Sequence, residues 1–204
     1  MIGEELVQQG FPESYKKLKQ YVDILASRGI EWGLLGPREA ERLWERHILN
    51  SLALVELIPE GLNLVDVGSG AGLPGLPLAI VRPDLTVTLM EPLLRRSDFL
   101  SQAVEELGCQ DQVRVVRVRA EDSKETFKAV TCRAVAPLDK LLRWCTPLIA
   151  LGGALYALKG SSAADEVAAA RKQLTKARLR AEVRSARAHV KAEATNVILV
   201  RRAA

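Results

Sequence analysis

The 204-residue sequence contains little that would anchor it in a membrane. No apolar run approaches the roughly 18 residues that a membrane-spanning helix needs. The first twenty residues, which are rich in Lys, Glu and Gln, lack the apolar stretch of a secretory signal. These absences argue against a membrane partner, and we expect a cytoplasmic protein.

Cysteine and aromatic residues are also scarce. Cys109, Cys132 and Cys145 are scattered, without a C-x-x-C pair and without His at ligand spacing. The sequence therefore indicates neither a disulfide framework nor a metal site, and buried free thiols are expected. Aromatic residues make up only 4%, while hydrophobic residues make up 48%, so we expect an aliphatic core.

Positive charge is present but unevenly distributed. The net charge is +4, yet residues 171–202 hold ten Lys or Arg against Glu182 and Glu193, which leaves a net −4 for the rest. Such asymmetry favours a surface that faces a polyanion, most often nucleic acid. A basic face that only meets solvent is the alternative.

The first third of the sequence has the periodicity of amphipathic helices. Apolar residues recur every three or four positions over Glu13–Gly29 and again over Gly36–Ile58, where Pro37 lies in the first turn. Residues 1–58 are therefore expected to form a helical extension, packed on a catalytic unit of residues 59–204. No Gly/Ser-rich linker separates the two parts.

After residue 59, short apolar runs alternate with helical stretches, which is typical of an α/β fold. The expected strands are Asn63–Gly68, Thr86–Glu91, Val113–Ala120, Ala129–Ala134 and Ala154–Gly160. The expected helices are Pro74–Val81, Leu93–Leu107, Leu138–Ile149 and Ala163–Ala177. Ala181–Val190 and Thr195–Arg202 would add an antiparallel pair at the edge. We predict a Rossmann-like, mostly parallel sheet with helices on both faces.

A glycine-rich turn follows the first expected strand. Gly68, Gly70, Gly72 and Gly75 lie where the chain must turn into a helix, and residues without a side chain let a ligand approach that backbone. The last three of them also fit the pattern G-x-G-x-x-G, which keeps a dinucleotide cofactor as an alternative.

Two acidic residues favour one of these cofactors. Glu91 ends the second strand, where a carboxylate can accept hydrogen bonds from both ribose hydroxyls of either cofactor. Asp66, two residues before Gly68, would repel a pyrophosphate but attract the sulfonium and ammonium groups of S-adenosyl-L-methionine. An NAD-dependent oxidoreductase is further disfavoured because no Tyr-x-x-x-Lys pair or catalytic His lies near a strand end.

Several sequence blocks resemble one known family. They are LWERHILNSLAL at 43–54, DVGSGAGLPGLPLAIVRP at 66–83, RAED at 119–122, TCRAVAPLDKL at 131–141 and ALKG at 157–160. This sequence resembles the bacterial 16S rRNA guanine-N7 methyltransferases, also called glucose-inhibited division protein B. The resemblance covers most of the chain and implies a class I methyltransferase fold with S-adenosyl-L-methionine as cofactor.

The resemblance also implies roles for individual residues. It places Gly68, Leu73, the ribose acid Glu91, the adenine contacts Ala120 and Glu121, and Arg133 in the cofactor site. To these the glycine turn adds Asp66 and Gly70. Lys159 would lie at the pocket rim. The family often has Asp where Asn50 stands, which leaves the role of that position open.

The implied partner is 16S rRNA, within the small ribosomal subunit or an assembly intermediate, and no obligate protein partner is predicted. Because guanine N7 has a lone pair and no proton, its methylation needs positioning rather than a strong base, so we expect no catalytic triad. Positioning candidates are Arg133 and Lys159. The expected RNA contacts are Arg133, Lys159, Arg95, Arg96 and the basic C-terminal surface. A non-catalytic RNA-binding or ribosome-assembly factor on the same scaffold remains the alternative.

Overall fold

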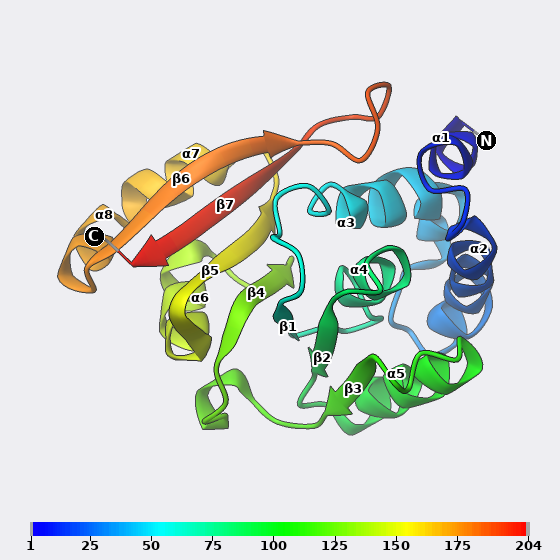
Figure 1. Ribbon diagram of the computed structural model, residues 1–204, viewed down its shortest axis with the longest axis horizontal. Coiled ribbons are helices and arrows are strands. Elements are labelled where there is room, and N and C mark those ends of the chain that lie inside the picture. Colours follow the sequence, from blue (N-terminus) through cyan, green and yellow to red (C-terminus); the bar gives the residue numbers. More distant parts are fainter. Residues whose placement is uncertain (1, 203–204) are drawn as a thin grey trace.

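The computed structural model describes residues 2–202, built around one seven-stranded sheet (Figure 1). Five strands run parallel, and their bounds are β1 (Asn63–Val67), β2 (Thr86–Met90), β3 (Val113–Val116), β4 (Phe127–Arg133) and β5 (Ile149–Lys159). β6 (Leu179–Ala186) and β7 (Thr195–Arg202) are antiparallel, and the sheet order is β3-β2-β1-β4-β5-β7-β6. The predicted fold class is therefore confirmed.

The N-terminal segment is helical, as its periodicity predicts. α2 (Tyr15–Ile24) continues through η1 (Leu25–Gly29), and a second helical stretch runs through η2 (Pro37–Arg42), η3 (Leu43–Leu49) and α3 (Asn50–Leu52). α1 (Ile2–Gly10) was not predicted, because its buried Gly3, Leu6 and Val7 give too short an apolar pattern. The division of the chain at residue 58 stays a prediction.

Helices cover both faces of the sheet. On one face, the N-terminal helices share a core cluster with α4 (Gly75–Val81) and α5 (Leu94–Glu106). On the other, α6 (Leu138–Cys145), α7 (Ala163–Ala169) and α8 (Arg171–Lys176) pack with their own cluster. Both clusters are mainly aliphatic, and all three cysteines are buried free thiols.

Some predicted boundaries were wrong. β3 ends at Val116 rather than Ala120, and the predicted helix 163–177 divides into α7 and α8. β5 begins at Ile149, five residues early, because α6 already ends at Cys145. The early part of β5 approaches β4 so closely that a Cβ on Gly153 would lie 2.8 Å from the Lys128 carbonyl. β6 covers Leu179–Ala186 instead of 181–190.

Within residues 2–202, no helix is both long and apolar enough to cross a membrane. The side chains of the candidate site gather at the carboxyl ends of β1, β2, β4 and β5. In an open, mostly parallel sheet this edge is where ligands bind, at the point where the strand order reverses. Here the order reverses between β1 and β4.

Candidate active site

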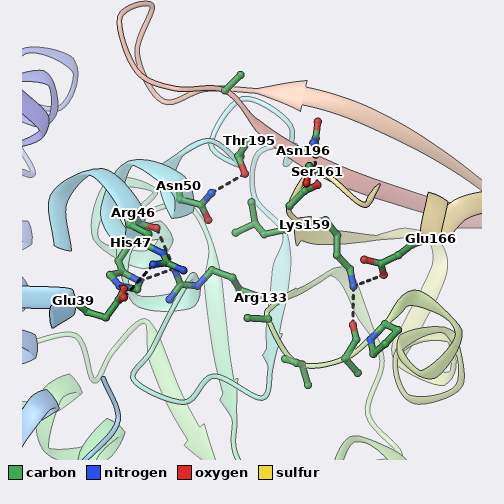
Figure 2. A pocket seen from close by; sticks show the side chains of 17 residues that line it. Glu39, Arg46, His47, Asn50, Arg133, Lys159, Ser161, Glu166, Thr195 and Asn196 are labelled. Carbon is green, nitrogen blue, oxygen red and sulfur yellow. Dashed lines mark hydrogen bonds and ion pairs between the residues drawn. The ribbon is translucent and has the colours of Figure 1, made fainter. Parts of the chain in front are cut away.

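Two hollows lie side by side at this edge. The first, which we call the glycine pocket, holds about 460 Å³ and is lined by the turn Gly68–Ala71, by Glu91 and by Arg96. The second, the Asn50 pocket, holds about 900 Å³ and is drawn in Figure 2. Arg133, Ala134 and Val135 line both, so the segment that follows β4 separates the two pockets.

The turn after β1 forms the glycine pocket from bare backbone. Gly68 and Gly70 have φ of +67° and +58°, a region that favours glycine. A Cβ on Gly68 would lie 3.1 Å from Val135 and would enter the space between the turn and the β4 loop. The absence of a side chain at Gly68 therefore keeps this part of the pocket open, and its contact with the cofactor stays a prediction.

Gly72 and Gly75 serve packing instead. A Cβ on Gly72 would lie 2.6 Å from Leu76, and one on Gly75 would lie 2.4 Å from Leu89. Furthermore, the Gly75 N–H at the start of α4 donates to Asp66 Oδ2 over 3.0 Å. This carboxylate occupies the helix terminus at which a dinucleotide fold binds its pyrophosphate. The literal G-x-G-x-x-G pattern is therefore not a pyrophosphate cradle here.

Asp66 is fully buried beneath the turn and lines neither pocket. It orders the turn through Gly75, and its predicted contact with the cofactor stays a prediction. Burial raises the pKa of Asp66 to about 7, although hydrogen bonds from Gly75 and Ser69 lower it. Its Oδ1 has no hydrogen-bond partner within residues 2–202.

Glu91 presents the buried carboxylate of the glycine pocket. It follows β2, is 2% exposed and lines the pocket. Its Oε2 accepts from the Gly70 N–H at 3.0 Å, and its Oε1 accepts from the Leu93 N–H at 3.1 Å. These two bonds fix the carboxylate, and each oxygen keeps acceptor capacity for a ligand hydroxyl.

A small apolar cavity of about 220 Å³ continues the glycine pocket beyond Glu91. The two share Gly68, Pro92 and Val135, and Met90, Val118 and Trp144 add apolar surface. Ala120 and Glu121, which resemble the family's adenine contacts, line this cavity within η4 (Ala120–Asp122). Leu73 lines the glycine pocket. An extended ligand can thus pass from turn to cavity along Glu91.

The N-terminal helices support the glycine pocket, which sequence reasoning missed. The buried Tyr21 hydroxyl of α2 donates to the Ala71 carbonyl over 2.7 Å and so fixes the middle of the turn. Leu34 and Leu35, in the segment before η2, form part of the wall. No sequence signal connects these residues to the turn, and Tyr21 lies 50 positions before Ala71.

Arg133 is joined to the N-terminal helices. One terminal nitrogen of its guanidinium donates to His47 Nδ1 at 2.8 Å and to the Arg46 carbonyl at 3.3 Å. Burial and the Arg133 charge lower the pKa of His47 to about 4, so the ring is neutral at pH 7. Its other nitrogen, Nε2, then donates to Glu39 Oε2 at 2.7 Å. Arg133 forms no ion pair within residues 2–202, so its charge is left for a ligand.

Lys159 is already paired. Its ammonium donates to Glu166 Oε2 and to the Ala136 carbonyl, both at 2.7 Å, and the side chain is 10% exposed. The Glu166 carboxylate also accepts from the Leu138 N–H at 2.8 Å. Lys159 therefore holds the loop between β4 and α6 in place. Contact with RNA would require this pair to open, and that role stays a prediction.

Arg95 and Arg96 lie in the first turn of α5 and are exposed. Arg96 lines the glycine pocket, whereas the Arg95 guanidinium lies 5.9 Å from the Trp32 ring centre. The two neighbours therefore face different surroundings. Their predicted contact with RNA is untested, and Arg96 is the closer of the two to the cofactor side.

The basic C-terminal segment divides between two ends of the β6–β7 hairpin. Ala186 pairs with Thr195 at one end, next to the Asn50 pocket, and Leu179 pairs with Arg202 at the other. Arg187 and Lys191 thus lie in the connecting loop, while Arg180, Arg201 and Arg202 lie at the far end (Figure 1). Arg171, Lys172 and Lys176 of α8 adjoin the far end, so most of the basic charge lies there and only Arg187 and Lys191 lie beside the Asn50 pocket.

The family model for rRNA small subunit methyltransferase G matches residues 14–195. The chain belongs to this family. Relatives that carry this name include proteins of Rhodococcus jostii and Corynebacterium jeikeium, both 56% identical, covering 83% and 86% of this chain and 76% and 82% of their own. One from Kineococcus radiotolerans is 53% identical over 81% of this chain and 66% of its own. Membership confirms the predicted family, the methyltransferase class and S-adenosyl-L-methionine as donor.

Solved structures confirm the fold. A precorrin-6y C5,15-methyltransferase from Geobacter metallireducens has a TM-score of 0.55 at 12% identity, covering 84% of this chain and 91% of its own. A ribosomal protein L11 methylase from Lactobacillus delbrueckii has a TM-score of 0.56 at 12% identity, covering 76% and 77%. At such low identity these likenesses concern the Rossmann-like fold alone.

Proposed function

We propose that this protein transfers a methyl group from S-adenosyl-L-methionine to N7 of a guanine in the decoding-region loop of 16S rRNA. The observation that carries the proposal is the shared wall: a pocket suited to the donor and a second pocket meet at Arg133, Ala134 and Val135. Methyl transfer needs donor and acceptor to be held on either side of one short gap.

The glycine pocket fits the donor on three observations. The Gly68 turn leaves space that a Cβ would fill, and the fixed Glu91 carboxylate can accept from ribose hydroxyls. The apolar cavity at Ala120 and Glu121 suits a purine ring. Arg133, which lacks an anionic partner within residues 2–202, would receive the donor's carboxylate. Leu73 and Gly70 would complete the contact surface.

The bound donor supplies an electrophilic methyl group on a sulfonium. The chain's own residues then need only hold the target and exclude water, because guanine N7 offers a lone pair and no proton has to be removed before attack. Positioning of this kind accounts for about 7 to 11 kcal/mol in model reactions. Arg133 and the loop that Lys159 fixes are the positioning elements.

The substrate is proposed to be the small ribosomal subunit or an assembly intermediate, in the cytoplasm. Family membership and the exposed basic residues of the β6–β7 hairpin support an RNA partner. The target base has to leave its stack to reach the donor.

Mapping of the modified nucleotide tests the proposal. RNA from cells with and without the gene should differ by one 7-methylguanine in 16S rRNA, and plasmid-borne protein should restore it. A Glu91→Ala variant should fail to restore it. Full restoration by this variant would favour a non-catalytic assembly factor. Calorimetry with S-adenosylhomocysteine and with NADH separates a methyltransferase from an oxidoreductase. Only S-adenosylhomocysteine should bind to a methyltransferase.

A further inference from the structure

The Asn50 pocket is built from four segments far apart in the sequence. Its walls come from η2 to α3, from the end of β4 and the loop after it, from the end of β5 through α7, and from the start of β7. With about 900 Å³ it falls in the size range of small-molecule sites. It adjoins the glycine pocket at Arg133–Val135, so whatever occupies it lies next to the donor side.

Most charges around this pocket neutralise one another. Lys159 pairs with Glu166 at 2.7 Å, and Arg46 pairs with Glu39 at 3.1 Å. Apart from Arg133, which also faces the glycine pocket, the lining therefore offers little net charge to a phosphate. A neutral polar ligand matches it better than an anion.

Asn50 is one of the polar residues in this lining that keep hydrogen-bonding capacity within residues 2–202, together with the Ser161 hydroxyl and the Asn196 amide oxygen, and it is the one that lies nearest in sequence to His47, which bonds Arg133. Its Nδ2 donates to Thr195 Oγ1 over 2.7 Å, a bond that joins the N-terminal helices to β7. Figure 2 shows that this bond turns the amide oxygen toward the space between Asn50 and Arg133. Within residues 2–202 that oxygen accepts no hydrogen bond, so Asn50 presents an oriented acceptor to the pocket.

We propose that the Asn50 pocket receives the flipped-out target guanine and that Asn50 Oδ1 accepts a hydrogen bond from its exocyclic N2 amino group. This inference rests on the proposed function and assigns the base site within it. Guanine carries this amino donor and adenine does not. The amino group lies on the edge opposite the imidazole ring, so this contact leaves N7 directed away from Asn50, where Arg133–Val135 border the donor side.

The contact can be tested by methylation of small subunits from cells that lack this gene. Asn50→Ala should lower kcat/KM for the subunit between about fivefold and a hundredfold, the range for losing one base-specific hydrogen bond. The dissociation constant for S-adenosylhomocysteine should stay within about twofold, because Asn50 does not line the glycine pocket. Asn50→Asp keeps an acceptor oxygen and should recover most of the loss.

A matched control is Asn63→Ala. The Asn63 side chain also bonds across the sheet, to the Thr126 carbonyl and the Lys128 N–H, but at the amino end of β1. The Asn63→Ala variant should leave kcat/KM for the subunit unchanged. Thermal unfolding of all variants reports whether they fold, and Asn50→Asp keeps the test decisive should Asn50→Ala be unstable.

Inosine at the target position separates base recognition from a structural role, because inosine lacks only the N2 amino group. In subunits reconstituted with semisynthetic 16S rRNA, the unaltered protein should methylate guanine at least about fivefold faster than inosine. Asn50→Ala should methylate both at one reduced rate. Equal guanine-to-inosine ratios for the two proteins would overturn the assignment, and so would wild-type kcat/KM in Asn50→Ala. If the unaltered protein methylates no subunits at all, the proposed function itself is wrong.

Discussion

The glycine pocket and the Asn50 pocket share a wall but are built differently. The first comes mainly from two short segments, Gly68–Leu73 and Glu91–Arg96, and is completed by Leu34, Leu35 and the shared Arg133–Val135. The second comes from side chains of residues 39–50, 133–137, 158–166 and 194–196. A site built from contiguous backbone leaves a pattern in the sequence, whereas a site assembled by tertiary packing does not.

The largest expected effect concerns the glycine pocket alone. Glu91→Ala should weaken S-adenosylhomocysteine binding about a hundredfold. The change removes the charged acceptor of the two proposed hydrogen bonds from the ribose hydroxyls, each worth about 1.5 kcal/mol or more. Calorimetry measures this. Glu105→Ala, an exposed change on α5, should bind normally. A Glu91→Ala variant that folds and binds within threefold of wild type would contradict the ribose role.

The two ends of the β6–β7 hairpin sharpen the comparison on the RNA side. Arg187→Glu with Lys191→Glu, in the loop beside the Asn50 pocket, should weaken subunit binding on the order of tenfold and flatten its salt dependence by roughly two phosphate contacts. Arg201→Glu with Arg202→Glu, at the far end, should have the smaller effect. Filter binding over a salt series distinguishes them, and equal slopes would mean that RNA covers both ends.

His47 and Asp66 should make the free energy of unfolding depend on pH with opposite signs. The folded pKa of His47 is lowered from 6.5 to about 4, so its contribution is present above pH 6.5 and is lost as the pH falls toward 4. The folded pKa of Asp66 is raised from 3.8 to about 7, so its contribution is present below pH 3.8 and is lost as the pH rises toward 7.

These opposite contributions partly cancel in the wild-type protein. In urea unfolding between pH 4 and 7, His47→Gln should lose stability as the pH rises, because Asp66 then dominates. Asp66→Asn should gain stability as the pH rises, because His47 remains. Parallel profiles for the two variants would show that these groups do not titrate as their burial implies.

The smallest effect is expected from the support of the glycine turn. Tyr21→Phe removes the buried hydroxyl that donates to Ala71 and should cost about 1 kcal/mol of unfolding free energy. It should also weaken S-adenosylhomocysteine binding a few-fold. Tyr15→Phe, which removes a hydroxyl bonded to Glu4 away from the pocket, is the matched control. Equal donor affinity in both variants would show that the helix does not order the turn.

The contrast between the pockets explains how much the sequence could predict. The mostly parallel sheet, its antiparallel edge pair and the bare turn at Gly68 follow from local periodicity and turn chemistry. The order of the strands does not. The burial of Asp66 could not be predicted, because spacing does not tell which side of a strand faces a pocket, and here that side packs on Gly75.

Other features depend on contacts that no local pattern contains. The Arg133–His47 bond spans 86 residues and the Asn50–Thr195 bond spans 145. Lys159 was predicted to be free to contact RNA, because the sequence does not show that Glu166 of α7 folds back to pair with it. The sequence could not show that Arg187 and Lys191 lie at one end of the β6–β7 hairpin while Arg201 and Arg202 lie at the other, because this depends on how the two strands pair.

The most direct test of two pockets with separate tasks is a crystal structure with S-adenosylhomocysteine. The account predicts the ligand in the glycine pocket, with its ribose at Glu91 and its adenine beside Ala120, and with the Asn50 pocket left open to the target base. Electron density for the ligand between Asn50 and Lys159, with the glycine pocket closed by side chains, would contradict it.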